Sequence, residues 1–173
     1  MNYLITLFTF YFYFSSFFMN QPNQKDLMLS YSKFISLNDF EQADQIEKLY
    51  VFNDSTLIFP VLEKDLMPKN GIIMEVPDWI RKFKNIKELF MVGLYISNLN
   101  SHLAKLPKLE KLKFAIPKNS DIEKLIAELS NLKTLKILDL SDSTISENQL
   151  KLIQKRLPKI KIINSNFQAD SSI

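Results

Sequence analysis

The chain has 173 residues, 46% of them hydrophobic, and a formal net charge of +3, which fits one domain with a modest core. It contains no cysteine, one histidine and two glycines. Disulfides, thiolate chemistry, histidine-rich metal sites and glycine-rich phosphate loops are therefore excluded by inventory, and we expect no enzymatic activity, cofactor or metal.

Residues 1–25 are expected to be a targeting segment outside the fold. The stretch Tyr3–Met19 is seventeen residues without a charge, and the first charged side chain is Lys25. This is slightly short for a membrane span of about 20 residues and suits the apolar region of a signal peptide. Because no basic residue precedes it and no clear cleavage site follows, a signal peptide and an uncleaved anchor both remain open. Either predicts an exported protein (secreted, periplasmic or at the surface), with membrane attachment through residues 3–19 if uncleaved.

One apolar pattern recurs along the rest of the chain: apolar, two residues, apolar, one residue, apolar. It begins at Ile46, Ile86, Leu109 and Leu135, and in part at Ile160. The central apolar positions are 49, 89, 112, 138 and 163, so the separations are 40, 23, 26 and 25 residues. The last three match the roughly 20–29 residues of leucine-rich repeats. The first is too long, which predicts an irregular insertion over about 52–74.

The pattern predicts short strands that alternate with returning legs. The alternating end of each unit is a strand with one buried face, and stacking of about three or more units completes a core. The legs carry helix signals: capping boxes at 120–123 and 146–149, the second helix being ended by Pro158. The predicted class is α/β: a short leucine-rich-repeat solenoid, or horseshoe fragment, with a parallel concave sheet and helical or irregular convex legs. The alternative is a generic α/β domain with a chance pattern.

Four segments resemble the leucine-rich-repeat family, in particular its small exported bacterial members. They are a connecting leg (76–89), a strand and turn (138–145), a closing repeat (145–162) and a short lead-in helix (36–43). The resemblance implies a repeat domain over 26–173, with a lead-in helix over about 36–44 and repeats over about 46–165. It also implies that the protein binds other proteins.

The sequence departs from the family at the asparagine that follows each strand. The corresponding positions hold Asp54, Leu94, Pro117, Ser143 and Gln168, so no asparagine ladder is expected there. Of these residues, Asp54 and Ser143 are expected to replace the asparagine in part by bonding to backbone groups of a neighbouring turn.

The concave face is predicted from the residues that alternate with the buried ones on each strand. The predicted partner-binding residues are Tyr50, Phe52, Phe90, Val92, Lys111 and Lys113, and the last strand is expected to present Ile162, Asn164 and Asn166. Aromatic residues flanked by cations are typical of an interface centre, so we expect a protein partner. The alternative is that segment 52–74 folds over these aromatic residues and buries them.

A second function is suggested by the stretch 81–118, which has nine basic residues and two acidic ones. A solvated face is the ordinary explanation, and an envelope-associated protein that binds anionic polymer or membrane is the functional alternative. No aromatic–basic recognition motif accompanies the charge, so nucleic acid is not expected. Of the remaining residues, Trp79 is expected in the core, His102 is not expected to be catalytic, and Asp139 and Asp142 are expected to form a turn.

Overall fold

The computed structural model describes residues 25–37, 40–54, 76–96 and 98–164. The stretch Tyr3–Met19 and most of the predicted insertion over 52–74 lie outside these residues. Within the described ranges, no helix has both the length and the apolar character needed to cross a bilayer.

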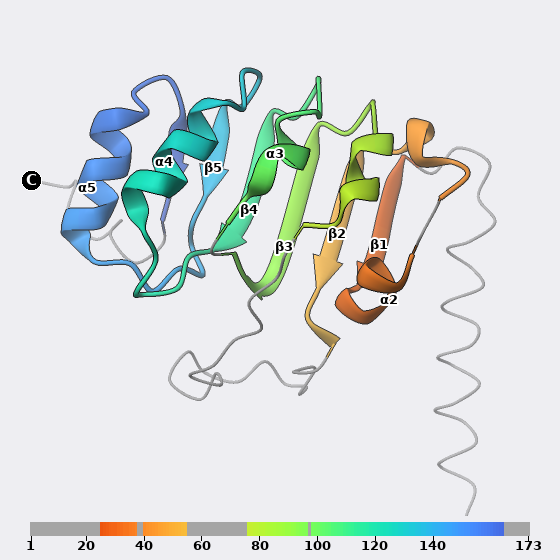
Figure 1. Cartoon of the computed structure of the whole chain (residues 1–173), viewed down its shortest axis with the longest axis horizontal. Helices are drawn as coiled ribbons and strands as arrows, with labels where there is room; N and C mark the ends of the chain where they lie inside the picture. Colours follow the sequence, from red (N-terminus) through yellow and green to blue (C-terminus); the bar gives the residue numbers. More distant parts are fainter. Residues whose placement is uncertain (1–24, 38–39, 55–75, 97, 165–173) are drawn as a thin grey trace, which may run out of the picture.

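In the described part of the chain, six parallel strands form one sheet in which each strand pairs with the next along the chain (Figure 1). The strands are β1 (Asp26–Ser30), β2 (Lys48–Phe52), β3 (Glu88–Tyr95), β4 (Lys111–Ala115), β5 (Ile137–Asp139) and β6 (Lys161–Ile163). A parallel sheet with this sequential order arises when the chain coils in one direction and adds one strand per turn. The predicted α/β solenoid is therefore confirmed.

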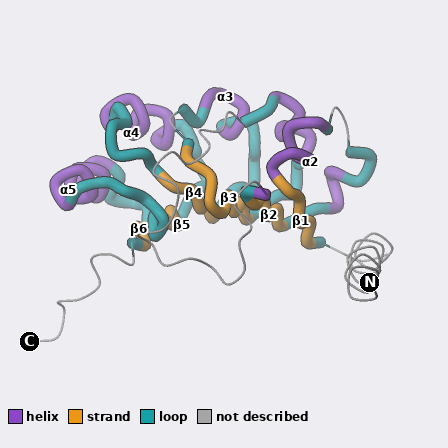
Figure 2. Tube along the Cα trace, turned by 90° about the horizontal axis from the view of Figure 1, so that it is seen from below, coloured by secondary structure: helices purple, strands orange, loops and turns teal. Residues whose placement is uncertain are grey.

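The legs between the strands are short helices. They are α2 (Tyr31–Ser36), η1 (Ala43–Gln45), η4 (Asp78–Lys82), α3 (Asn100–Leu103), α4 (Ile122–Ser130) and α5 (Glu147–Arg156). Figure 2 shows the helices on the outer side of a curved sheet and the strands on the inner side. One face of the sheet is thus covered by the legs, and the opposite, concave face is lined by strand residues alone among the described elements.

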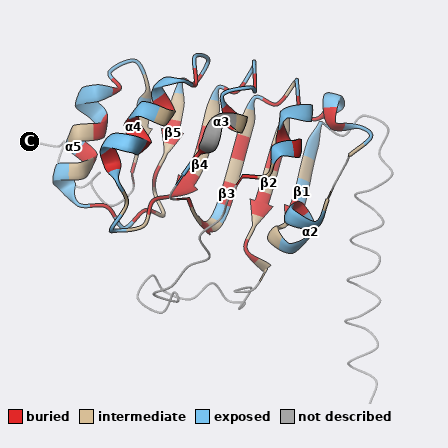
Figure 3. Cartoon of the chain, in the orientation of Figure 1, coloured by how far each residue is buried: buried red, intermediate tan, exposed pale blue. Residues whose placement is uncertain are grey.

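The core lies between the sheet and the legs. Leu49, Leu89, Leu112 and Leu138 stand side by side on neighbouring strands and are fully buried. Apolar residues of the legs close the core from the other side, and Figure 3 shows this buried layer running the length of the coil. Trp79 is 8% exposed and packs against Phe34 with ring centroids 4.8 Å apart, which confirms its predicted place in the core.

Two ends of the coil differ from the prediction. A first strand, β1, precedes the predicted repeats, because Leu27 pairs with Leu49 in the same register as the later leucines. At the other end, Ile162 and not Ile163 pairs with Leu138. The assignment of Ile162 to the concave face was wrong, because the position that pairs with Leu138 lies 24 and not 25 residues after it. Asn164, also expected on the concave face, is buried, and Asn166 lies outside the described residues.

The helix starts were partly predicted. Ser146 caps α5, with a reciprocal bond from the Ser146 backbone to the Gln149 side chain, so the second capping box is confirmed. The first was wrong by one residue: the side chain of Asp121 accepts from the Lys124 N–H and caps α4. A helix over about 36–44 was also wrong, because α2 ends at Ser36 and, among the described residues of this range, only the 3-10 turn η1 follows.

Polar side chains bond the coils together where the asparagine ladder is missing. Buried Ser143 accepts from the Ile116 N–H at 3.0 Å, and Asp54 accepts from the Ser32 N–H at 3.2 Å. Both residues therefore act as predicted. The sequence analysis missed Asn53, which is buried and donates to the carbonyl oxygen of Gly93 at 3.1 Å.

Candidate interaction surface

The structure places the six predicted partner-binding residues on the concave face. They alternate with fully buried neighbours on β2, β3 and β4, such as Leu49 and Val51 on β2. The strand register brings distant residues into rows: Tyr50 lies beside Phe90, and Phe90 lies beside Lys113. Segments forty residues apart thus contribute to one continuous surface.

A stacked aromatic pair lies at the centre of this surface. The rings of Tyr50 and Phe90 are 4.7 Å apart between centroids and inclined by only 5°. Both residues are half-buried, because neighbouring side chains cover the ring faces. Aromatic contact across adjacent strands holds both side chains in place and leaves their outer edges toward the open side of the sheet.

Apolar side chains extend the surface on both sides of the pair. Met28, which pairs with Tyr50 from β1, is 66% exposed, and Val92 is 43% exposed. Met28, Tyr50, Phe52, Phe90 and Val92 together form what we call the concave patch. Met28 was missed from the sequence because β1 was not recognised as a strand. Its signal was the apolar-x-apolar pair Leu27 and Leu29, which directly follows the first two charged residues, Lys25 and Asp26.

A bulge shapes the patch at Val92. Phe90 pairs with Lys113, but Tyr95 pairs with Ala115, so β3 has more residues than β4 between these two pairs. Gly93 lies in this bulge with φ of +69°, a left-handed conformation that glycine adopts without strain. Leu94 is buried inside the bulge. This explains why position 94, where the leucine-rich-repeat pattern has asparagine, is apolar in this chain.

Cations lie next to the concave patch. The ammonium group of Lys111 lies over the Phe90 ring, 5.0 Å from its centroid. Lys48 pairs with Glu88 at 3.2 Å, and this hydrogen bond raises the pKa of Lys48. Lys113 pairs with Asp142 at 3.2 Å. The predicted basic middle of the face is therefore present, but one of its two lysines is already neutralised within the chain.

The basic stretch 81–118 does not form a single face. Arg81 lies on the convex leg η4 and pairs with Asp78 at 2.9 Å, whereas Lys87 pairs with Glu47 at the start of the strands, at 2.6 Å. Lys111 and Lys113 point to the concave side. Since consecutive basic residues are spread over three sides of the coil, the structure does not gather them for one anionic surface.

Other polar residues have structural partners. His102 Nδ1 lies 2.9 Å from Asp78 Oδ1, and both belong to the convex legs. The carboxylate of Asp139 accepts from the N–H and the hydroxyl of Ser141, at 3.1 and 2.6 Å, which confirms its turn-forming role. Within the described ranges, no group of three or more histidine and acidic residues is arranged to hold a metal.

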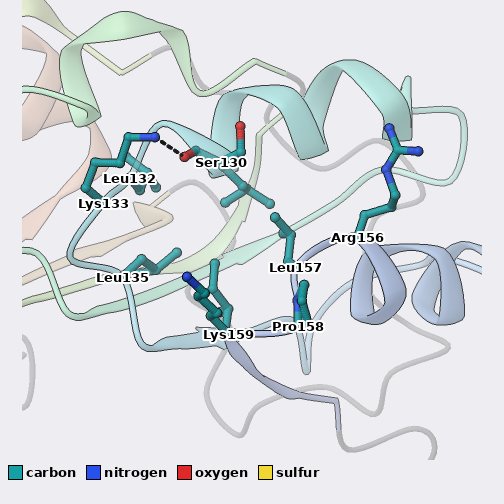
Figure 4. A pocket seen from close by; sticks show the side chains of 10 residues that line it. Ser130, Leu132, Lys133, Leu135, Arg156, Leu157, Pro158 and Lys159 are labelled. Atoms are coloured by element: carbon teal, nitrogen blue, oxygen red, sulfur yellow. Dashed lines mark hydrogen bonds between the residues drawn. The ribbon is translucent and has the colours of Figure 1, made fainter.

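A cavity of about 320 Å³ lies between the ends of α4 and α5 (Figure 4). Four leucines line it, together with three basic residues: Lys133, Arg156 and Lys159. Lys133 donates to the Ser130 carbonyl at 3.2 Å, and Arg156 approaches Glu123 at 3.5 Å. Because both helices end here, their terminal carbonyls carry partial negative charge that offsets these cations. These basic residues are thus explained by the helix ends and their own partners, and the cavity gives no selective anion site.

Comparison with known proteins does not assign the chain to a family. No protein-family model and no curated protein matches the chain. Among solved structures, it is similar to a leucine-rich-repeat protein of Leptospira interrogans, with 23% identity over 68% of this chain and a TM-score of 0.43. The chain spans 25% of that protein's length. The fold assignment therefore rests on the strand order and the repeated core positions of the chain itself.

Proposed function

We propose that this chain is a non-catalytic module that binds a protein partner through the concave patch. The observation that carries the proposal is the exposure of Met28 and Val92 beside a pre-ordered Tyr50–Phe90 pair. Contiguous exposed apolar surface is costly in water and marks binding sites. Rigid aromatic side chains also lose little entropy on binding, which favours them as interface anchors.

Export is part of the same proposal and rests on the sequence of residues 1–25. A partner would then be met outside the cytoplasm or at a membrane surface. Binding of an anionic polymer or membrane through a basic face has less support, because the basic residues of 81–118 lie on different sides of the coil and several pair with carboxylates.

The test compares two matched substitutions in the full-length chain, tagged at its carboxyl end and kept in mild detergent. Val92→Glu places a charge on the concave patch. Ile35→Glu makes the same kind of change on α2, where Ile35 is 51% exposed. Proteins captured from extracts of the source cells and their medium are then quantified by mass spectrometry.

We expect a partner that the wild type and Ile35→Glu retain and that Val92→Glu loses. Capture should persist in about 0.5 M salt, because apolar contact is not screened as surface charge is. The proposal is wrong if all three proteins capture the same set. Partners that are lost with added salt but retained by Val92→Glu would support the charge-driven alternative.

A further inference from the structure

The two faces of the Phe90 ring are already in contact with other side chains of the chain. Tyr50 stacks on it from β2, and the ammonium group of Lys111 lies over it from β4 on the other side of β3. A partner therefore cannot insert a flat group against Phe90. It meets the outward ring edges, which carry the positive part of the aromatic quadrupole.

Lys111 also differs from the other lysines of the concave face. Among the described residues, Lys48 and Lys113 each have a carboxylate partner at 3.2 Å. Among the described residues, no carboxylate oxygen lies within 4.0 Å of the Lys111 ammonium nitrogen. This ammonium group lies over the Phe90 ring instead. A half-buried cation fixed over a ring is thus available to an anionic group from outside.

We propose that the partner is an acidic–apolar peptide segment that presents a carboxylate to Lys111. An apolar side chain of the same segment covers the edges of Tyr50 and Phe90. This inference rests on the proposed function. Neighbouring strands are about 4.8 Å apart and an extended chain advances about 3.4 Å per residue, so the acid lies one or two positions from the apolar residue.

The test selects peptides from a random phage-displayed library on the immobilised full-length chain. Five forms are compared: the wild type, Lys111→Glu, Lys111→Met, Lys105→Glu and Val92→Glu. Lys111→Met keeps an unbranched apolar side chain over Phe90 and removes the charge, which guards against misfolding of the glutamate variant. Lys105→Glu is the matched control, because Lys105 is exposed on a convex leg.

The wild type and Lys105→Glu should enrich peptides with Asp or Glu one or two positions from an apolar residue. Lys111→Glu should lose this preference. A synthetic peptide of the enriched sequence should bind the wild type about fivefold more tightly than its amide counterpart, the size of an exposed ion pair. Fluorescence anisotropy should show that Lys111→Met binds both peptides equally.

Three results would overturn this inference. Enrichment of apolar peptides without an acidic preference, or an acidic preference that Lys111→Met retains, would leave the proposed function standing. Enrichment of purely acidic peptides without an apolar residue is the third result that contradicts the inference. If the wild type enriches no peptide that Val92→Glu does not also enrich, both the proposed function and this inference fail.

Discussion

Asn53 donates a hydrogen bond from Nδ2 to the carbonyl oxygen of Gly93, 3.1 Å away, across 40 residues of sequence. The backbone N–H of Asn53 also donates to the Val92 carbonyl at 3.0 Å. A Cβ atom on Gly93 would lie 3.4 Å from the Asn53 Cβ. The end of β2 therefore holds the bulge of β3, and with it the position of Val92 in the concave patch.

This relationship predicts that Gly93→Ala and Asn53→Ala both destabilise the protein. Alanine at position 93 must adopt a left-handed backbone conformation, which lowers the free energy of unfolding by about 1–2 kcal/mol. Alanine at 53 leaves the Gly93 carbonyl without this donor, at about 1–3 kcal/mol. Urea unfolding measures both, with exposed Lys105→Ala as a control expected within about 0.5 kcal/mol of the wild type. An unchanged Gly93→Ala would show that the left-handed conformation is not required.

The acid sensitivity of the fold is predicted to depend on Glu47. Its carboxylate accepts from Lys25 at 2.7 Å and from Lys87 at 2.6 Å, and these hydrogen bonds lower the pKa of Glu47 from 4.5 to about 2. Because the unfolded chain takes up this proton first, the stabilisation is complete above about pH 4.5 and is lost as the pH falls toward 2.

Thermal unfolding of Glu47→Gln checks this directly. The variant should melt at a lower temperature than the wild type at pH 6, and the two melting temperatures should converge as the pH approaches 2. Glu41→Gln, at an exposed position, serves as the control and should follow the wild type. A difference between wild type and Glu47→Gln that is constant from pH 6 to pH 2 would rule out the ion pairs as its source.

Ser143 is predicted to stabilise the contact between the turn after β4 and the turn after β5. Its hydroxyl accepts from the N–H of Ile116 at 3.0 Å, and both residues are buried. Ser143→Ala leaves that N–H without this acceptor and should cost about 1–3 kcal/mol in urea unfolding. Ser130→Ala, at an exposed helix end, should change stability by less than about 0.5 kcal/mol. Equal small effects would mean that another group or water replaces the hydroxyl.

The Tyr50–Phe90 stack is predicted to stabilise the protein beyond the burial of each ring. A double-mutant cycle with Tyr50→Leu and Phe90→Leu should give a coupling of about 0.5–1.5 kcal/mol. Chemical denaturation of the four proteins measures it. A coupling near zero would mean that the rings are not held against each other, and that the concave patch is not pre-ordered.

The inward positions of the middle strands could be predicted because a buried leucine recurs at the same position of one apolar pattern. Leu49, Leu89, Leu112 and Leu138 follow this rule. The ends of the coil do not, since each end strand has one neighbour among the described residues, and the inward position of β6 is Ile162 and not the predicted Ile163. The cap of α4 was also ambiguous, because Ser120 and Asp121 can both bond a helix amino terminus and the chain path decides between them.

The candidate surface was only partly predictable. Alternation along a strand shows which side chains point outward, so six of its residues were identified. Contacts between strands depend on pairings 22 to 40 residues apart, and these placed Met28 beside Tyr50 and Lys111 over Phe90. The alternative in which segment 52–74 covers the aromatic residues falls mainly on residues outside those described.

The central claim, recognition through the concave patch, is tested most directly by site-specific photo-crosslinking in the source cells. The photoreactive residue p-benzoylphenylalanine is placed at Met28, at Val92, or at Ile35 on α2, all of which are well exposed. Our account predicts a crosslinked product with one protein partner from positions 28 and 92, and none from position 35. A product from position 35 alone, or the same products from all three positions, would contradict it.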